Sequence, residues 1–195
     1  MLKDLFNIAI SLIFKPSETW KDLSKQRNDS HDSFLSGYVY PFMGLIVAAA
    51  FLGVLFTGKE KDLQIALKES IVTLLSMFGG FFLASYLVNE VWHTILHHEN
   101  KMKLCQRFVG YSSSLMYCLN IVLSLFPEFF FLRFLLLYTI YIVWEGATPY
   151  MDVKEPEQLK FVGFSTAIIV LTPIVISFIL GVVMPGLKSV PSVSQ

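Results

Sequence analysis

Five long apolar runs constrain the fold of this chain more than any other feature. They cover residues 34–57, 70–92, 108–126, 129–144 and 161–184. A helix needs about 20 mostly apolar residues to cross the hydrocarbon core of a bilayer, and only the fourth run falls clearly short of that length. Charged residues make up 15% of the chain, against about 25% in a typical soluble domain. The sequence therefore predicts an all-α integral membrane protein with five transmembrane helices.

The first 33 residues have a different pattern from the apolar runs. The stretch "MLKDLFNIAISLIF" places Leu5, Ala9 and Ile13 on one side of a helix and Lys3 and Asn7 on the other. This pattern predicts an amphipathic helix that lies in the membrane surface without crossing it. We expect an interfacial N-terminal segment at 1–33, a five-span membrane domain at 34–184 and a short flexible tail at 185–195.

Lysine and arginine are unevenly divided between the two sides of the predicted bundle. One side carries Lys3, Lys15, Lys21, Lys25, Arg27, Lys101, Lys103, Arg107, Lys154 and Lys160, and the other carries Lys59, Lys61, Lys68 and Lys188. Short loops rich in lysine and arginine stay in the cytoplasm. The asymmetry predicts a cytoplasmic N-terminus and a C-terminus outside.

Other functional classes have little support in the sequence. The formal net charge is +0, which gives no indication of a nucleic-acid partner. The chain has no GxSxG, phosphate-loop or HExxH pattern and no paired carboxylates within the apolar runs. We expect a protein that is not an enzyme and holds no cofactor. Cys105 and Cys118 have no redox or zinc-site spacing and are expected to be free thiols.

Two stretches resemble a known family of membrane proteins. "KMKLCQRFVGYSSSLM" and "FPEFFFLRFLLLYTIYIVWEGA" are similar to the Yip (Ypt/Rab-interacting protein) domain family, and "FKPSETWKDL" resembles the pre-membrane signature of bacterial members. The residues that carry the resemblance are Pro16, Trp20, Arg107, Phe108, Gly110, Tyr111, Ser112, Pro127 and Gly146. The resemblance extends over roughly residues 14–184.

The resemblance implies a five-span helical protein with a cytoplasmic N-terminus. Eukaryotic members of the family bind prenylated Rab-type GTPases and act in vesicle traffic and membrane shaping. Here the pre-membrane segment is short, and "HHENKMKLCQ" replaces the Gly-Gly-Lys-like turn of many members. Both features indicate a prokaryotic-type member, and hence a location in the cytoplasmic (inner) membrane of a prokaryote.

A basic loop precedes the third span and is the predicted partner-binding region. Lys101, Lys103 and Arg107 lie in it, and Tyr111 follows one helical turn later. We interpret the chain as a scaffold that recruits partners, or organises the membrane, at the cytoplasmic face. The expected partners are membrane lipid and other membrane proteins, in a homo-oligomer or a hetero-oligomer.

The stretch "NEVWHTILHHENK" permits a second interpretation. Glu90, His93 and His97 fall within about 60° of one another on a helix, so they could present a carboxylate and two imidazoles to one divalent metal ion. Polar residues at a helix end, beside Trp92 at headgroup depth, are also typical of an interfacial rim. We favour the rim, and the alternative is a small transporter or channel component for a metal cation.

Three small residues in the second span predict a close helix contact. Ser76, Gly80 and Ala84 are spaced by four, which lets a neighbouring helix approach. The neighbour could be the first span, where Gly44 and Ala48 have the same spacing, or another copy of the chain.

Two residues within the spans have further consequences for packing. Asn120 lies mid-way along the third span, and we expect its amide to find a hydrogen-bond partner on another helix. Pro173 should kink the fifth span, because proline cannot complete the helical hydrogen-bond ladder.

Overall fold

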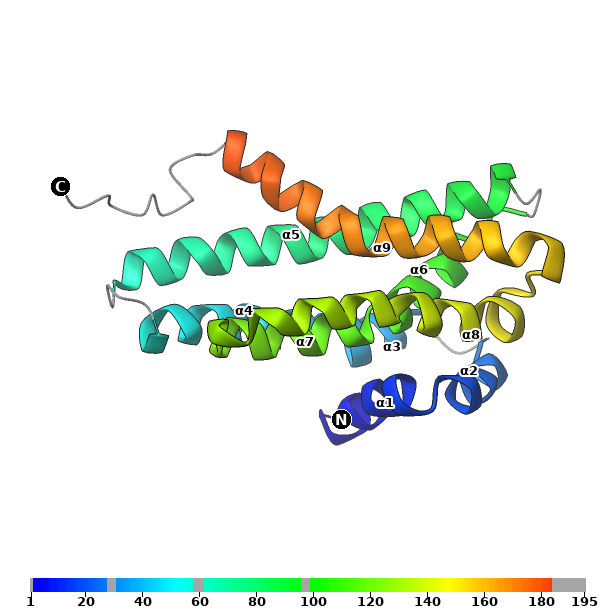
Figure 1. Cartoon of the computed structure of the whole chain (residues 1–195), viewed down its shortest axis with the longest axis horizontal. Helices are drawn as coiled ribbons and strands as arrows, with labels where there is room; N and C mark the ends of the chain where they lie inside the picture. The colour runs from blue at the N-terminus through cyan, green and yellow to red at the C-terminus, as the bar shows by residue number, and fades with distance from the viewer. Residues whose placement is uncertain (1, 28–30, 58–61, 96–98, 184–195) are drawn as a thin grey trace.

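The computed structural model describes residues 2–27, 31–57, 62–95 and 99–183, and the regular elements in these ranges are all helical. In chain order they are α1 (Leu2–Phe14), α2 (Pro16–Lys25), α3 (His31–Phe34), η1 (Leu35–Val39), α4 (Tyr40–Thr57), α5 (Leu63–Glu90), η2 (Val91–Ile95), α6 (Met102–Ser112), α7 (Ser114–Leu125), η3 (Pro127–Tyr138), α8 (Thr139–Met151) and α9 (Glu155–Val183). The long helices lie side by side in a bundle, with α1 and α2 outside it (Figure 1).

Within these ranges, four helical stretches are long and apolar enough to cross a membrane, and a bent helix pair brings the number to five when the pair is counted as one span. The stretches are His31–Thr57, Leu63–Thr94, Pro127–Met151 and Glu155–Val183, and the pair joins Met102–Ser112 to Ser114–Leu125 at 45°. The predicted fold, a five-span helical membrane protein with an amphipathic helix before the spans, is confirmed. The observed stretches are longer than the apolar runs, because each helix continues beyond its apolar part.

The bend between α6 and α7 lies in the sequence Ser112-Ser113-Ser114. The Ser113 hydroxyl donates to the carbonyl of Val109 at 2.7 Å, and the Ser114 hydroxyl donates to the carbonyl of Tyr111. Serine side chains that bond to the preceding helical turn compete with the backbone ladder and bend helices. The Ser114 hydroxyl also lies 2.6 Å from the hydroxyl of Tyr38, which holds the bend against the first span.

The fourth span differs from the prediction at its C-terminal end. The fourth predicted run ends at residue 144, but α8 continues to Met151 and is terminated by Asp152, whose backbone adopts the left-handed conformation with φ 55°. Gly146 is a buried residue inside the helix. Its role is close packing against Trp20. The other end agrees with the sequence, because Pro127 separates α7 from η3.

Gly80 of α5 packs against α9. A Cβ atom added to Gly80 would lie 2.8 Å from Cγ of Pro173, and Ser76 and Ala84 are also buried. Gly44, in contrast, has no atom within 4 Å of the position of a Cβ. The atoms nearest to Gly80 therefore belong to α9 of the same chain, whereas the sequence suggested the first span or another copy of the chain. The helix α9 also changes direction part-way along (Figure 1).

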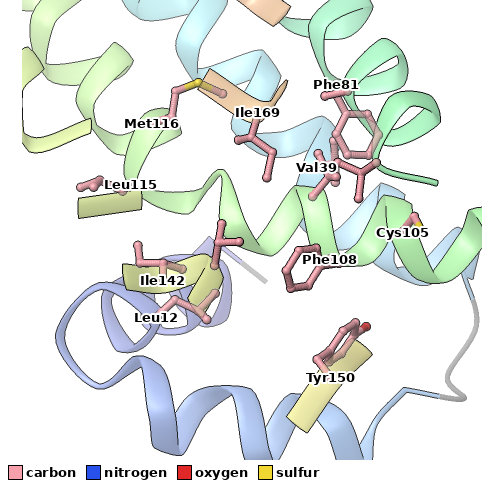
Figure 2. Packing of buried hydrophobic residues seen from close by; sticks show 14 of the residues in the cluster. Leu12, Val39, Phe81, Cys105, Phe108, Leu115, Met116, Ile142, Tyr150 and Ile169 are labelled. Carbon is pink, nitrogen blue, oxygen red and sulfur yellow. The ribbon is translucent and has the colours of Figure 1, made fainter. Parts of the chain in front are cut away.

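The helix α1 packs one face against the bundle. Its buried residues are Leu5, Ala9 and Leu12, and Leu12 lies beside Ile142 of α8 (Figure 2). The Tyr138 hydroxyl donates to the carbonyl of Ile13 at 2.9 Å. Apolar side chains remain exposed on the same helix, and they are Phe6, Ile10 and Phe14. The helix thus has one apolar face for the protein and further apolar surface that lipid can cover.

Candidate functional site

The helix α2 is held to the bundle by Trp20, which is completely buried. Its indole Nε1 donates to the carbonyl of Ile142 at 2.9 Å. A Cβ atom on Gly146 would lie 2.5 Å from the indole ring, so only glycine leaves room for this tryptophan. The ring centroids of Phe108 and Tyr150 lie 5.3 and 5.1 Å from that of Trp20. Figure 2 shows Phe108 pointing toward Tyr150.

Arg107 ties α6 to the C-terminal end of α2. Its side chain is almost buried, with 6% exposure, and Nη1 donates to the carbonyl oxygens of Gln26 at 3.2 Å and Arg27 at 2.9 Å. A cation is favourable at the C-terminus of a helix, where the last carbonyl groups lack partners. Arg27 in turn bonds Asp152 at 2.6 Å. Polar contacts therefore join the C-terminal ends of α2 and α8 to each other and to Arg107 of α6.

An open pocket of about 640 Å³ lies beside these contacts. Its charged lining comes from Arg27 and Arg107 together with Lys101 and Lys103 at the beginning of α6, and His31 of α3 also borders it. The side chains that the structure describes around the pocket include no carboxylate. We refer to this feature, defined by Arg27, His31, Lys101, Lys103 and Arg107, as the basic pocket.

The four predicted partner-binding residues occupy two different places. Lys101 and Lys103 are exposed and line the basic pocket together with Arg107. Tyr111 lies deeper, with its ring 4.9 Å from those of both Phe34 and Tyr38. Gly110 permits this packing, because a Cβ there would lie 2.6 Å from the Phe34 ring. Tyr111 thus packs among aromatic rings.

Sequence reasoning missed two members of the basic pocket, Arg27 and His31. Both lie in or beside the polar stretch "RNDSHDS", which has no apolar periodicity and no motif. The sequence places this stretch on the same predicted side of the membrane as the basic loop. This position suggests that Arg27 and His31 lie near the loop, but it does not distinguish them from the neighbouring residues of the stretch.

The predicted metal ligands are only partly within the described residues. His97 lies outside them. His93 is exposed on η2, and Glu90 is half-buried and accepts a 3.5 Å hydrogen bond from Thr94. In the ranges that the structure describes, no group of three or more His, Cys, Asp or Glu side chains is placed to hold a metal ion.

Trp92 and Asn120 differ from the sequence expectations. Trp92 is buried, its Nε1 donates to the carbonyl of Glu99 at 3.1 Å, and its ring lies 6.0 Å from that of Phe161. It is therefore a packing residue inside the bundle, where the sequence suggested a residue of the interfacial rim. The Asn120 amide donates to the carbonyl of Met116 in its own helix at 2.9 Å. The expected bond to another helix is replaced by one within α7.

The Yip1 domain family model matches residues 10–185, which is nearly the whole chain. The chain belongs to the Yip1 family. No curated protein sequence and no solved structure matches it. The match confirms the resemblance, and the geometry gives several residues of that resemblance a physical role. In this Yip1 domain, Trp20, Phe108 and Gly146 form one packing unit and Arg107 fastens α2 over it.

Proposed function

We propose that this Yip1-family membrane protein is not an enzyme and recruits partners at the cytoplasmic face of a prokaryotic inner membrane, where it also organises the surrounding lipid. The observation that carries the proposal is the basic pocket, which lies on a support of buried contacts. Trp20 and Arg107 fix α2 against α8 and α6, so the cations of the pocket are presented in a defined arrangement. A basic surface favours a partner with an acidic or phosphate-bearing surface.

The distribution of charge supports the orientation. The cations of the basic pocket belong to the side of the bundle with the larger number of lysine and arginine residues, and such segments stay in the cytoplasm. The helix α1 supports the organising role, because Ile10 and Phe14 are exposed apolar residues beside the bundle. Their burial in the lipid surface would anchor the N-terminal segment in one leaflet.

Site-specific photo-crosslinking tests the recruitment. A photoreactive phenylalanine analogue replaces Lys101 at the basic pocket, and the control carries it at Phe134, an exposed residue of η3. We expect discrete protein adducts from position 101 that are lost when Lys103 is also changed to Glu. The control should react mainly with lipid. The same adducts from both positions, or adducts at 101 that persist with Lys103→Glu, would contradict recruitment through this surface.

Cysteine labelling in intact cells tests the orientation. In a background without Cys105 and Cys118, single cysteines at Ser24 and Lys103 should resist a membrane-impermeant thiol reagent, and one at Ser194 should react. Labelling at position 103 but not at 194 would reverse the proposed orientation and place the basic pocket outside the cell.

A further inference from the structure

We propose that the basic pocket binds a phosphate group, supplied by the headgroup of an anionic lipid in the adjacent leaflet. This inference deepens the proposed function and rests on it, because it names the chemistry of the ligand that the same surface would take. It also adds Arg27 and His31, from the N-terminal segment, to the residues of the site.

Charge is the first argument for a phosphate ligand. Four basic side chains, Arg27, Lys101, Lys103 and Arg107, line one open pocket. Arginine and lysine are the side chains that bind phosphate, arginine through its planar fork of donors and lysine as a compact charge. Arg107 uses Nη1 for the carbonyl groups of α2, so its contribution to a ligand is mainly its positive field. Lys101, Lys103 and Arg27 provide the donors that a bound anion would contact.

Among the residues that the structure describes, three carboxylates lie near the pocket without lining it. Asp152 pairs with Arg27 at 2.6 Å, Glu99 lies 3.7 Å from Lys101, and Asp32 follows His31 in the chain. All three are exposed, where ion pairs contribute little and are screened by salt. A phosphate in the pocket would compete with Asp152 for Arg27. The pocket therefore has a built-in carboxylate competitor whose removal should strengthen anion binding.

The size and the wall of the pocket fit a lipid headgroup. Its volume of about 640 Å³ lies in the range of roughly 300–1,000 Å³ that is usual for small-ligand sites. Met102 and Leu104 add apolar surface to the charged wall. Phosphatidic acid has a charged phosphate group at one end and acyl chains at the other, so it can use both kinds of surface.

The lengths of the helices place the pocket at headgroup level. Charged residues of α9 end at Lys160, and residues 161–183 are apolar apart from a few hydroxyl groups. These 23 residues span about 34 Å at 1.5 Å per residue, close to the hydrocarbon thickness of about 30 Å. Residues 155–160 therefore lie outside the hydrocarbon. They share an end of the bundle with α2 and the beginning of α6 (Figure 1), which places the basic pocket among the lipid headgroups.

Lipid binding by the purified full-length protein tests the inference. The protein in neutral detergent micelles is titrated with dioleoyl phosphatidic acid and, in parallel, with dioleoyl phosphatidylcholine. Bound lipid is counted by native mass spectrometry, and the affinity is taken from the lipid-dependent shift in unfolding temperature. We expect saturable binding of one phosphatidic acid and at least tenfold weaker binding of phosphatidylcholine. Equal binding of the two lipids would overturn the inference.

Matched charge variants locate the binding site. Lys101→Gln with Lys103→Gln removes two exposed cations from the pocket, and Lys154→Gln with Lys160→Gln removes two exposed cations from the same end outside it. Each cation attracts an anionic lipid, so the loss of both cations should weaken binding on the order of thirtyfold. The second pair should change it much less. Equal losses in the two pairs would indicate diffuse attraction and overturn the site.

Asp152→Asn should strengthen lipid binding, whereas the lysine variants should weaken it. Asparagine tolerates the left-handed backbone conformation of this position, so the helix end should be preserved while the competing carboxylate is removed. We expect phosphatidic acid to bind several-fold more tightly. If Arg27 serves only to hold α2, the variant will lower the unfolding temperature without tightening binding, and the inference fails.

Soluble phosphates distinguish a lipid headgroup from a soluble phosphate ester as the source of the bound phosphate. Inorganic phosphate and glycerol 3-phosphate are added as competitors of the bound lipid. Weak competition, only at concentrations far above that of the lipid, supports a membrane headgroup. Displacement at equal concentration would overturn the lipid assignment in favour of a soluble phosphate ester. The measurement in micelles does not depend on orientation in the cell, so its failure would leave the cysteine-labelling and crosslinking tests of the proposed function unaffected.

Discussion

The two halves of the fourth span, η3 and α8, are both apolar but differ in what they contact. None of the residues of η3 is buried, and Phe130 and Phe134 are 69% and 77% exposed. In α8, seven residues are buried: Thr139, Ile142, Val143, Gly146, Ala147, Tyr150 and Met151. The difference shows that apolar character alone does not decide burial in a membrane protein, because lipid is as apolar as leucine.

The two halves of the fourth span differ in how closely they pack against other helices. Gly146 in α8 lets the Trp20 indole lie against the helix backbone, and the indole NH completes its hydrogen bond on the same helix. The half formed by η3 has no small residue of this kind, and its phenylalanine side chains are exposed, while Leu132 and Leu136 are only half-buried against the core. It is a 3₁₀ helix, whose hydrogen bonds are poorer than those of an α-helix. We therefore expect substitutions in α8 and its partners to cost far more stability than those in η3.

Trp20→Ala should cause the largest loss of stability. It removes a fully buried side chain and its hydrogen bond to Ile142, and comparable truncations cost about 3–5 kcal/mol. The matched control is Trp144→Ala, which changes an exposed tryptophan on α8 itself. Thermal unfolding in one detergent should show a large decrease for position 20 and a small one for position 144. Similar decreases would mean that α2 is not held by Trp20.

Gly80→Leu tests, at a second helix contact, whether close packing at a glycine determines stability. A side chain there would collide with Pro173 and force α5 and α9 apart, at a cost of about 1–3 kcal/mol or more. Gly44→Leu introduces the same side chain where no atom lies within 4 Å. Size-exclusion chromatography after heating should show earlier loss of the folded peak for Gly80→Leu alone. An unchanged profile for both would contradict the α5–α9 packing.

Gly146→Ala and Gly163→Ala should have different effects on stability. At position 146 the added methyl group meets the Trp20 indole, which is fixed by its hydrogen bond, so about 1–3 kcal/mol should be lost. At position 163 the methyl group meets nothing within 4 Å, and alanine favours the helix by up to about 1 kcal/mol over glycine. Unfolding temperatures should fall in the first variant and stay or rise in the second.

Phe134→Leu should have the smallest effect. The side chain is exposed on η3 and keeps its apolar character in the variant, so the expected change lies within about 0.5 kcal/mol. Thermal stability and assembly size should both match the parent protein. A clear loss of either would show that another chain covers this face, and the contrast between η3 and α8 would then hold only for the isolated protein.

The main features of the fold could be predicted from sequence. The apolar runs located the five spans, and the repeat of apolar residues in α1 predicted a helix before them. These predictions depend on chain length against bilayer thickness and on helical periodicity, both of which are local properties. The predicted end of the fourth span, at residue 144, was wrong. The helix continues through Gly146 because this glycine packs against Trp20, which lies far earlier in the chain.

The candidate site was less accessible from the sequence. Lys101, Lys103 and Arg107 were suggested by their spacing in one basic loop, and all three line the basic pocket. Arg27 and His31 come from a separate polar segment, and their position depends on how α2 docks. Tyr111 follows Arg107 by one helical turn, yet the α6 helix directs it toward Phe34 and Tyr38.

The sequence by itself determined that this protein lies in a bilayer, that it is helical and where its spans lie. The reason is that transfer of apolar side chains and backbone groups into lipid depends on the composition along each helix. Tertiary structure alone decided which faces meet protein and which meet lipid. Lipid solvates every apolar face, so the choice depends on contact geometry between distant residues, such as Gly146 with Trp20 and Gly80 with Pro173. The same long-range packing brings α2 to α6 and so assembles the basic pocket from two segments of the chain.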